Sequence, residues 1–324
     1  MEPGAAEAQV GPAPGRRRRG PWLNAVLFLV TLATTLLAGA PLSAGLPEDP
    51  GLADVARAGL PYAAAILGIL LAHEMGHYVA ARLWGVDTTL PFFIPGPPAF
   101  GVGTFGAVIR IRSTLPSRRA VLDIGAAGPI AGFLVAVPLL AWGMAHSEVR
   151  SLGAAVLPNG HAGSPFAVLR ALLEGQGIGG DASSLQLMGD SLLTWGVQRL
   201  VLGVLPPGHD VFLHPVAFAG WLGLFVTTLN LLPIGQLDGG HVLYAWLGRE
   251  RARRASRLVS WGLLLCGLFL SWNWLVWWLI TRFAVKLDHP PALEEAPLGR
   301  KRAAVAVLSL VLFALTFIPI PVSV

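Results

Sequence analysis

The order of apolar and charged residues divides the chain into long, largely uncharged stretches separated by polar connectors. Six stretches are long enough to cross the roughly 30 Å hydrocarbon core of a bilayer, which takes about 20 helical residues. They occupy residues 22–40, 62–84, 124–145, 211–232, 258–281 and 303–324. The pattern predicts an α-helical polytopic membrane protein with about six transmembrane helices.

The composition supports a membrane protein. Hydrophobic residues make up 54% of the chain and charged residues only 13%, against about 25% charged residues in an ordinary soluble domain. Residues 1–21 are basic and rich in Pro, Gly and Ala, so we expect a disordered tail there. Residues 22–324 are expected to form a single domain, with an extracytoplasmic loop at about 147–210. An interfacial helix is expected within residues 185–205 of that loop.

Arginine clusters before the first and third stretches and after the fourth predict the orientation, because basic loops face the cytosol. They flank spans and lack interleaved aromatic residues, so we expect no nucleic-acid partner. One basic cluster, residues 300–302, conflicts with this scheme if 258–281 crosses the membrane once. Either that segment is a re-entrant hairpin turning near 271–274, or the rule fails for this loop.

Histidines with the spacing of metal ligands lie inside the second stretch, in His73-Glu74-Met75-Gly76-His77. Helix positions four apart share a face, so His73 and His77 can bind one metal ion while Glu74 reaches a water beside it. The alternative is a proton relay or ion pathway. At about 1.5 Å per residue, His73 lies roughly 20 Å from the outer end of its span, toward the cytosolic side.

A catalytic zinc commonly takes three protein ligands, so a third must come from elsewhere. Asp238 is the candidate, at the end of Asn230-Leu-Leu-Pro-Ile-Gly-Gln-Leu-Asp-Gly-Gly after the fourth stretch. Pro233 ends a helix, and the glycines let the backbone approach another element closely. The alternative for Asp238 is a solvated carboxylate at a helix end.

The two motifs together resemble those of the site-2 proteases, zinc metalloproteases that cut within membrane-spanning segments. The shorter pieces Arg110-Ile-Arg-Ser, Gly128-Pro-Ile-Ala-Gly-Phe and Asp288-His-Pro-Pro resemble the bacterial and plastid branch. The resemblance implies one Zn²⁺ per chain held by His73, His77 and Asp238, with Glu74 as the catalytic base. It also implies that Asn230 holds substrate or stabilises the oxyanion, although a membrane Asn can equally pack helices.

Residues 88–112 do not have a helical pattern, because four prolines interrupt them and the following residues alternate as in a strand. We expect a short membrane-associated β region there, between the second and third spans and near the metal. Its expected use is to pair with an extended substrate as an added strand, and the alternative is an ordinary connector.

The sequence therefore predicts an intramembrane zinc endopeptidase. By the resemblance, its substrates are single-span membrane proteins such as anti-sigma factors or membrane-tethered transcription factors, and its location is the bacterial cytoplasmic membrane. The alternative is a metal-dependent or proton-coupled transporter that uses the same buried groups. The remaining histidines and Cys266 are not assigned to the metal: Cys266 is expected to pack, His241 to support the aspartate motif, and the others to lie in solvated loops (His161, His209, His214 and His289).

Overall fold

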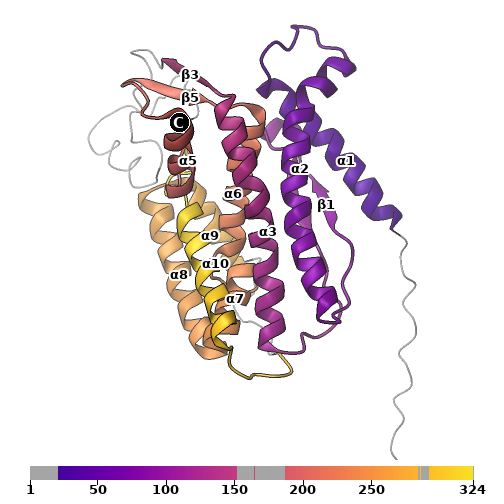
Figure 1. Cartoon of the computed structure of the whole chain (residues 1–324), viewed down its shortest axis with the longest axis vertical. Helices are drawn as coiled ribbons and strands as arrows, with labels where there is room; N and C mark the ends of the chain where they lie inside the picture. The colour runs from indigo at the N-terminus through magenta and orange to yellow at the C-terminus, as the bar shows by residue number, and fades with distance from the viewer. Residues whose placement is uncertain (1–20, 152–163, 165–186, 284, 286–291, 324) are drawn as a thin grey trace, which may run out of the picture.

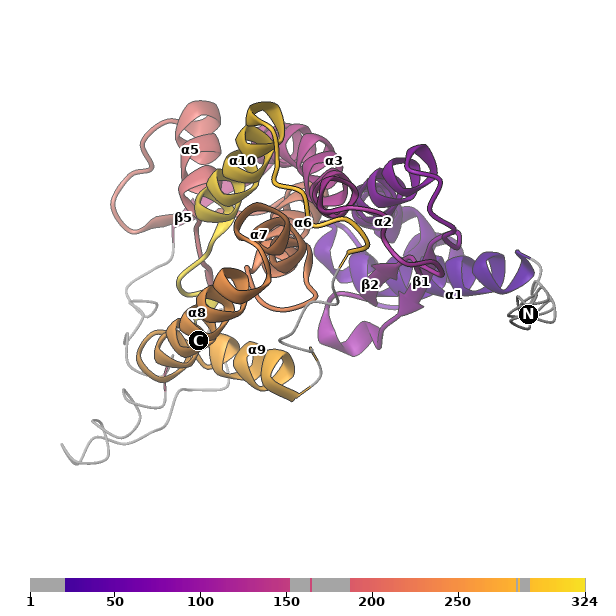
Figure 2. The ribbon, with the colours of Figure 1, turned by 90° about the horizontal axis from the view of Figure 1, so that it is seen from below.

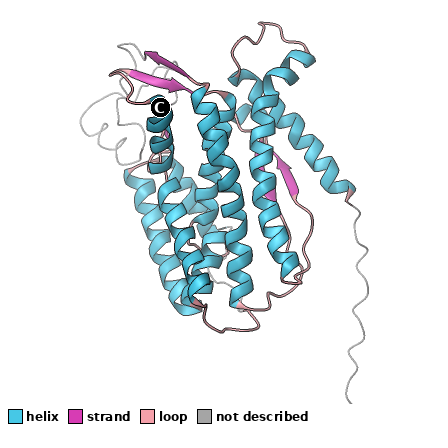
Figure 3. Cartoon of the chain, in the orientation of Figure 1, coloured by secondary structure: helices cyan, strands magenta, loops and turns pink. Residues whose placement is uncertain are grey.

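The computed structural model describes residues 21–151, 164, 187–283, 285 and 292–323, and they form a mainly helical bundle (Figures 1 and 3). Residues 1–20 of the expected tail and the histidines at 161 and 289 lie outside the described residues. The α-helices are α1 (Trp22–Gly39), α2 (Leu52–Leu83), α3 (Arg118–Ala145), α5 (Leu192–Leu202), α6 (Pro215–Leu231), α7 (Asp238–Leu247), α8 (Arg249–Phe269), α9 (Trp272–Phe283) and α10 (Arg300–Thr316).

Three helices in the described part of the chain are long and apolar enough to cross a membrane: α1 with its short continuation to Leu42, α2, and α3. α6 is apolar but has only 17 residues. The α2 helix begins at Leu52, ten residues before the predicted span. Pro61 lies inside this helix and does not end it. Its 32 residues correspond to about 48 Å, so the first turns, with half-buried Asp54 and exposed Arg57, extend past the roughly 30 Å hydrocarbon core.

The centre of the bundle is α3, which packs against α2 on one side and α6 on the other (Figure 2). Small residues permit these close approaches. A Cβ atom on Gly143 would lie 2.2 Å from the backbone nitrogen of Ala217, and one on Gly220 would lie 2.8 Å from the Cα of Leu140. The helix axes can therefore approach each other as small-residue interfaces in membranes allow.

A β-hairpin lies between α2 and α3 in the chain, formed by β1 (Phe92–Pro95) and β2 (Thr104–Val108). Polar side chains of the neighbouring helices hold its backbone. Asn24 of α1 donates to the carbonyl of Pro91 at 2.8 Å, and Tyr62 of α2 donates to the carbonyl of Val102 at 2.8 Å. The hairpin is thus fixed to α1 and α2, as seen beside them in Figure 1.

The segment 258–281 is two helices rather than one. α8 ends at Phe269, α9 begins at Trp272, and the two pack together. A Cβ on Gly267 would lie only 2.6 Å from the backbone nitrogen of Leu275, so the helices approach closely just beyond their turn. Of the two alternatives left by the sequence, the structure has the hairpin.

This hairpin changes the placement of the basic cluster at 300–302. Arg302 of α10 forms an ion pair with Asp123 of α3 at 2.8 Å, and the indole of Trp84, just after α2, donates to the same carboxylate at 3.1 Å. The cluster therefore lies at the end of the bundle where α2 ends and α3 begins. The conflict with the positive-inside pattern disappears, because the cluster shares this end with Arg118 and Arg119.

The opposite end of the bundle carries the other two short sheets and α5. β3 (Glu148–Ser151) pairs with β5 (His209–Phe212), and β4 (Leu187–Met188) pairs with β6 (Val322–Ser323), both antiparallel. The predicted span at 211–232 starts too early, because Val211 and Phe212 belong to β5 and the helix begins at Pro215. Their apolar character serves a strand, and Pro215 suits the first turn of a helix.

Candidate metal centre

Two histidines of α2 lie side by side facing the centre of the bundle. His73 and His77 are separated by one helical turn and are 4% and 7% exposed, and their Nε2 atoms lie 3.1 Å apart. α2 can pack this closely on α3 because Gly76 lies between the histidines. A Cβ there would lie 2.5 Å from the carbonyl oxygen of Ala127. The two imidazoles thus lie on one face of α2, where their spacing in the sequence predicts them.

Asp238 reaches the same point from a different part of the chain. α6 ends at Leu231, and a turn that includes Gly235, with φ +56°, returns the chain to begin α7 at Asp238. The turn is tight: a Cβ on Gly239 would lie 2.0 Å from the carbonyl oxygen of Leu231. The Oδ2 atom of Asp238 lies 3.3 Å from Nε2 of His73 and 3.2 Å from Nε2 of His77.

The three ligand atoms form a nearly equilateral triangle with edges of 3.1 to 3.3 Å. Tetrahedral zinc has bonds of about 2.0 to 2.1 Å to nitrogen, and a tetrahedron of that size has edges of about 3.3 to 3.4 Å. Two imidazoles and one carboxylate also form a donor set of the kind found in catalytic zinc sites, which leave one position open. The described residues therefore fit a zinc ion in both chemistry and spacing.

The second nitrogen of His77 has a fixed partner. Its Nδ1 donates to the main-chain carbonyl of Ile124 in α3 at 2.7 Å. In a neutral imidazole, this bond leaves the lone pair on Nε2, the atom that points at His73 and Asp238. The carbonyl thus fixes the tautomer that a metal ligand needs.

Two glycines of α3 make room for the imidazoles, and sequence reasoning gave them no such role. A Cβ on Gly128 would lie 2.1 Å from Nε2 of His77, and one on Gly132 would lie 3.2 Å from the Cβ of His73. Their spacing of four residues puts both on one face of α3. His73 and His77 are also four residues apart, and this equal spacing is the sequence signal that could have indicated the role of the two glycines.

Glu74 and Asn230 lie beside the triangle. Glu74 is 6% exposed, and its carboxylate lies within hydrogen-bonding reach of the backbone amide of Ile109, one residue after β2. The side-chain nitrogen of Asn230 lies 3.2 Å from Nε2 of His73. The structure therefore brings all five predicted site residues together, from α2, α6 and α7.

The described residues outside this group have other roles. His241 packs on α3: a Cβ added to Gly125 of that helix would lie 2.8 Å from the Cβ of His241. His214 accepts from the backbone amide of Val216 at the start of α6, and His209 contacts the carbonyl of Pro207. Cys266 is half-buried in α8. Among the described residues, one cluster of three or more potential metal ligands is found, and it is the triangle.

Comparison with known proteins assigns a family to this arrangement. The model of peptidase family M50 matches residues 61–272, a stretch that includes all three corners of the triangle. The chain belongs to peptidase family M50. The resemblance to the site-2 proteases is therefore confirmed. Because this family consists of peptidases, the alternative of a transporter is not favoured. No solved structure gives a significant match to this chain.

Plant proteins are among the relatives of the M50 chain. It is 32% identical over 283 residues to "Probable zinc metalloprotease EGY1, chloroplastic" from Oryza sativa subsp. japonica, a match covering 86% of this chain and 44% of the relative. It is 29% identical over 306 residues to "Probable zinc metalloprotease EGY2, chloroplastic" from Arabidopsis thaliana, covering 93% and 49%. The chain thus spans about half the length of these relatives. Their names give no support to the expected bacterial cytoplasmic membrane.

Proposed function

We propose that this protein is an intramembrane zinc endopeptidase that hydrolyses peptide bonds in or near the membrane-spanning segments of other proteins. The observation that carries the proposal is the triangle of His73, His77 and Asp238, in which the two buried histidines lie, with Glu74, on a helix long enough to span a bilayer. Zinc bound there would polarise the scissile carbonyl and lower the pKa of a bound water toward about 7.

The residues around the metal would divide the remaining chemistry. Glu74 takes a proton from the attacking water and returns it to the leaving amine, as a general base and then a general acid. The backbone amide of Ile109 orients its carboxylate. Asn230, beside His73, donates from its amide to the substrate carbonyl oxygen as negative charge develops there.

The β-hairpin provides a place for the substrate. β2 ends one residue before Ile109, so its edge leads directly to the carboxylate of Glu74. Phe105 on this strand is 66% exposed and offers an apolar contact. A substrate helix hides its peptide bonds in its own hydrogen bonds, and pairing as an added strand would hold an unwound segment extended for cleavage.

The proposed substrates are single-span membrane proteins, and regulators such as anti-sigma factors or membrane-tethered transcription factors are the proposed kind. The six predicted crossings counted residues 258–281 as one span; because that segment folds back as the α8–α9 hairpin, we propose about five crossings, with the metal reached from the cytosolic side. Water can reach a site there, as hydrolysis requires.

A Glu74→Gln variant tests the function, because it removes the base and leaves the metal ligands in place. Membrane proteomes of cells with the native and variant chains would be compared for single-span proteins truncated near a membrane boundary. We expect such stubs to accumulate with the variant while the purified variant retains one zinc per chain. A His77→Ala variant serves as the matched control and should lose both zinc and cleavage. Retained zinc without any accumulated stub would contradict the proposal.

A further inference from the structure

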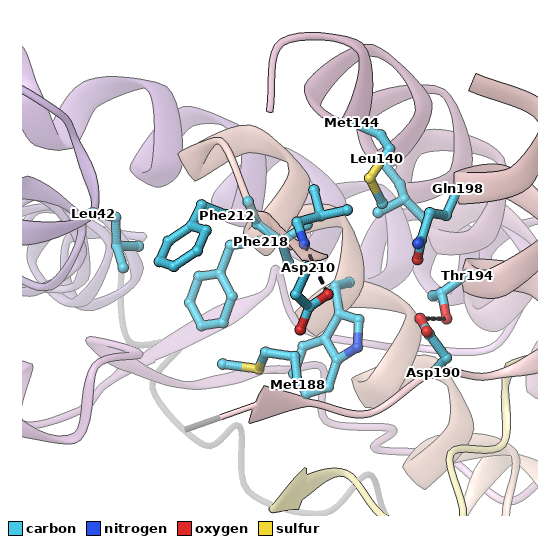
Figure 4. A pocket seen from close by; sticks show the side chains of 13 residues that line it. Leu42, Leu140, Met144, Met188, Asp190, Thr194, Gln198, Asp210, Phe212 and Phe218 are labelled. Atoms are coloured by element: carbon cyan, nitrogen blue, oxygen red, sulfur yellow. Dashed lines mark hydrogen bonds between the residues drawn. The ribbon is translucent and has the colours of Figure 1, made fainter. Parts of the chain in front are cut away.

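A second feature lies at the other end of the bundle, in a cavity of about 230 Å³ beneath the β3–β5 sheet (Figure 4). We call it the β5 cavity. Its walls come from the last turns of α3, the first turns of α6, β5 and α5, and they include Leu140, Met144, Phe218 and Trp221. The volume exceeds the roughly 150 Å³ apolar cavity that is known to hold benzene. It therefore has room for a small organic molecule.

The cavity has acidic groups and no basic ones among the described residues that line it. Asp210 projects into it from β5, and Asp190 lies at its rim before α5 (Figure 4). The carboxylate of Asp210 accepts from the backbone amide of Val211 at 2.8 Å, and that of Asp190 accepts from Thr194 at 3.0 Å. Among the described residues, these bonds leave most of the acceptor capacity of both carboxylates unused.

Neither carboxylate forms an ion pair with a described residue. Arg150 lies opposite Asp210 in the β3–β5 pairing, but its guanidinium binds Glu148 at 2.9 Å and lies 4.8 Å from the ring centre of Phe212. Burial and the nearby charge of Asp210 raise the pKa of Asp190. Two carboxylates that share one cavity repel each other, and a cation between them would relieve that repulsion.

The apolar wall complements the charge. Phe218 and Trp221 are stacked with their ring planes 9° apart, and the Trp221 indole is fixed by donation to the carbonyl of Gly189 at 2.8 Å. Aromatic faces attract cations, and methionine side chains such as Met144 adapt to irregular apolar shapes. A ligand with one positive charge and an apolar body would satisfy both halves of the cavity.

We propose that the β5 cavity binds a protonated amine carried by a small apolar group, with the ammonium between Asp210 and Asp190 and the apolar group against Phe218 and Met144. The side-chain amide of Gln198, which also lines the cavity, offers a further oxygen to the ammonium. The site is separate from the metal centre and does not depend on the proposed proteolysis.

The test uses two probes of equal shape on the full-length chain in lipid nanodiscs. Binding of 4-fluorophenethylammonium and of the neutral 4-fluorophenethyl alcohol would be followed by fluorine NMR. We expect the ammonium to bind at least about tenfold more tightly than the alcohol. Equal binding of the two probes, or binding of neither, would overturn the proposal, and this comparison needs no variant to fold.

Variants locate the site. Asp210→Asn should weaken ammonium binding at least about tenfold, whereas Asp49→Asn, at an exposed position in the loop before α2, should leave it unchanged. Ammonium binding that is insensitive to Asp210→Asn would place the probe elsewhere and overturn the proposal. A further arm with acetyl-Phe-Lys-amide distinguishes a lysine side chain from a free amine as the source. If this peptide competes with the ammonium probe, a lysine side chain can occupy the site; if it does not compete, the site takes a free amine. Both results support an amine site.

Discussion

Each histidine of the metal centre packs against one glycine of α3: His77 against Gly128 and His73 against Gly132. His73, Glu74 and His77 could be predicted from sequence because ligand spacing on a helix depends only on local geometry. The partners of the imidazoles could not, since Gly128, Gly132 and the carbonyl of Ile124 reach them only when α3 packs on α2. Asp238 is intermediate: its turn was visible in the sequence, but its distance to the histidines depends on tertiary packing.

Gly128→Ala should disrupt the metal centre without adding or removing a charge. The new Cβ would overlap Nε2 of His77, so the imidazole must turn away from Asp238. Outer partners of metal ligands typically contribute 10- to 100-fold to affinity, and we expect zinc affinity to fall by at least about tenfold in chelator competition.

Gly68→Ala on α2 is the control for Gly128→Ala, because no atom lies within 4 Å of its Cβ position. It should bind zinc as the native chain does and gain slightly in helix stability. Equal zinc affinity of the two variants would show that the imidazole tolerates a side chain on α3.

At the scale of the elements, the apolar stretches of the sequence predict only some of the helix boundaries. Pro233 marked the end of α6 correctly, because proline removes a helix hydrogen bond. Pro61 did not interrupt α2, and the break between α8 and α9 falls at Leu270 and Ser271 without a proline or glycine. That break is explained by packing: the two helices gain close contact at Gly267 by folding back.

Gly267→Ala should therefore weaken the α8–α9 pair. Its Cβ would lie 2.6 Å from the Leu275 backbone nitrogen, and overpacking of this kind typically costs about 1 to 3 kcal/mol. Thermal unfolding in the same detergent would measure the loss. Gly262→Ala, on the same helix with no atom within 4 Å of its Cβ position, should leave stability equal or slightly higher. A loss of the same size in both variants would indicate an effect of helix propensity or backbone freedom instead.

Across the whole molecule, polar contacts gather the starts of α3 and α10 and the end of α7 at one end of the bundle. The buried guanidinium of Arg118 donates to the carbonyl of Ala245 at 2.7 Å and to that of Glu295 at 3.2 Å. Charge distribution predicted a common side for the arginine clusters, but this arrangement needed the α8–α9 hairpin, which charge alone left undecided.

Site-specific labelling would test this arrangement in the membrane. In a Cys266→Ala background, cysteines at the exposed positions Arg119 and Lys301 should react with an impermeant maleimide from the same side of sealed vesicles. A cysteine at exposed Glu48 should react from the other side. Opposite reactivity of positions 119 and 301 would be incompatible with the hairpin.

The separation of the metal ligands along the chain bears on the order in which the protein matures. His73 and His77 lie on α2, whereas Asp238 opens α7, more than 150 residues later. A ribosome that has inserted α2 and α3 has produced two thirds of a zinc site with no carboxylate to complete it. All three metal ligands are therefore present only after α7 has been synthesised, so any activity that depends on the metal can begin only late in biogenesis.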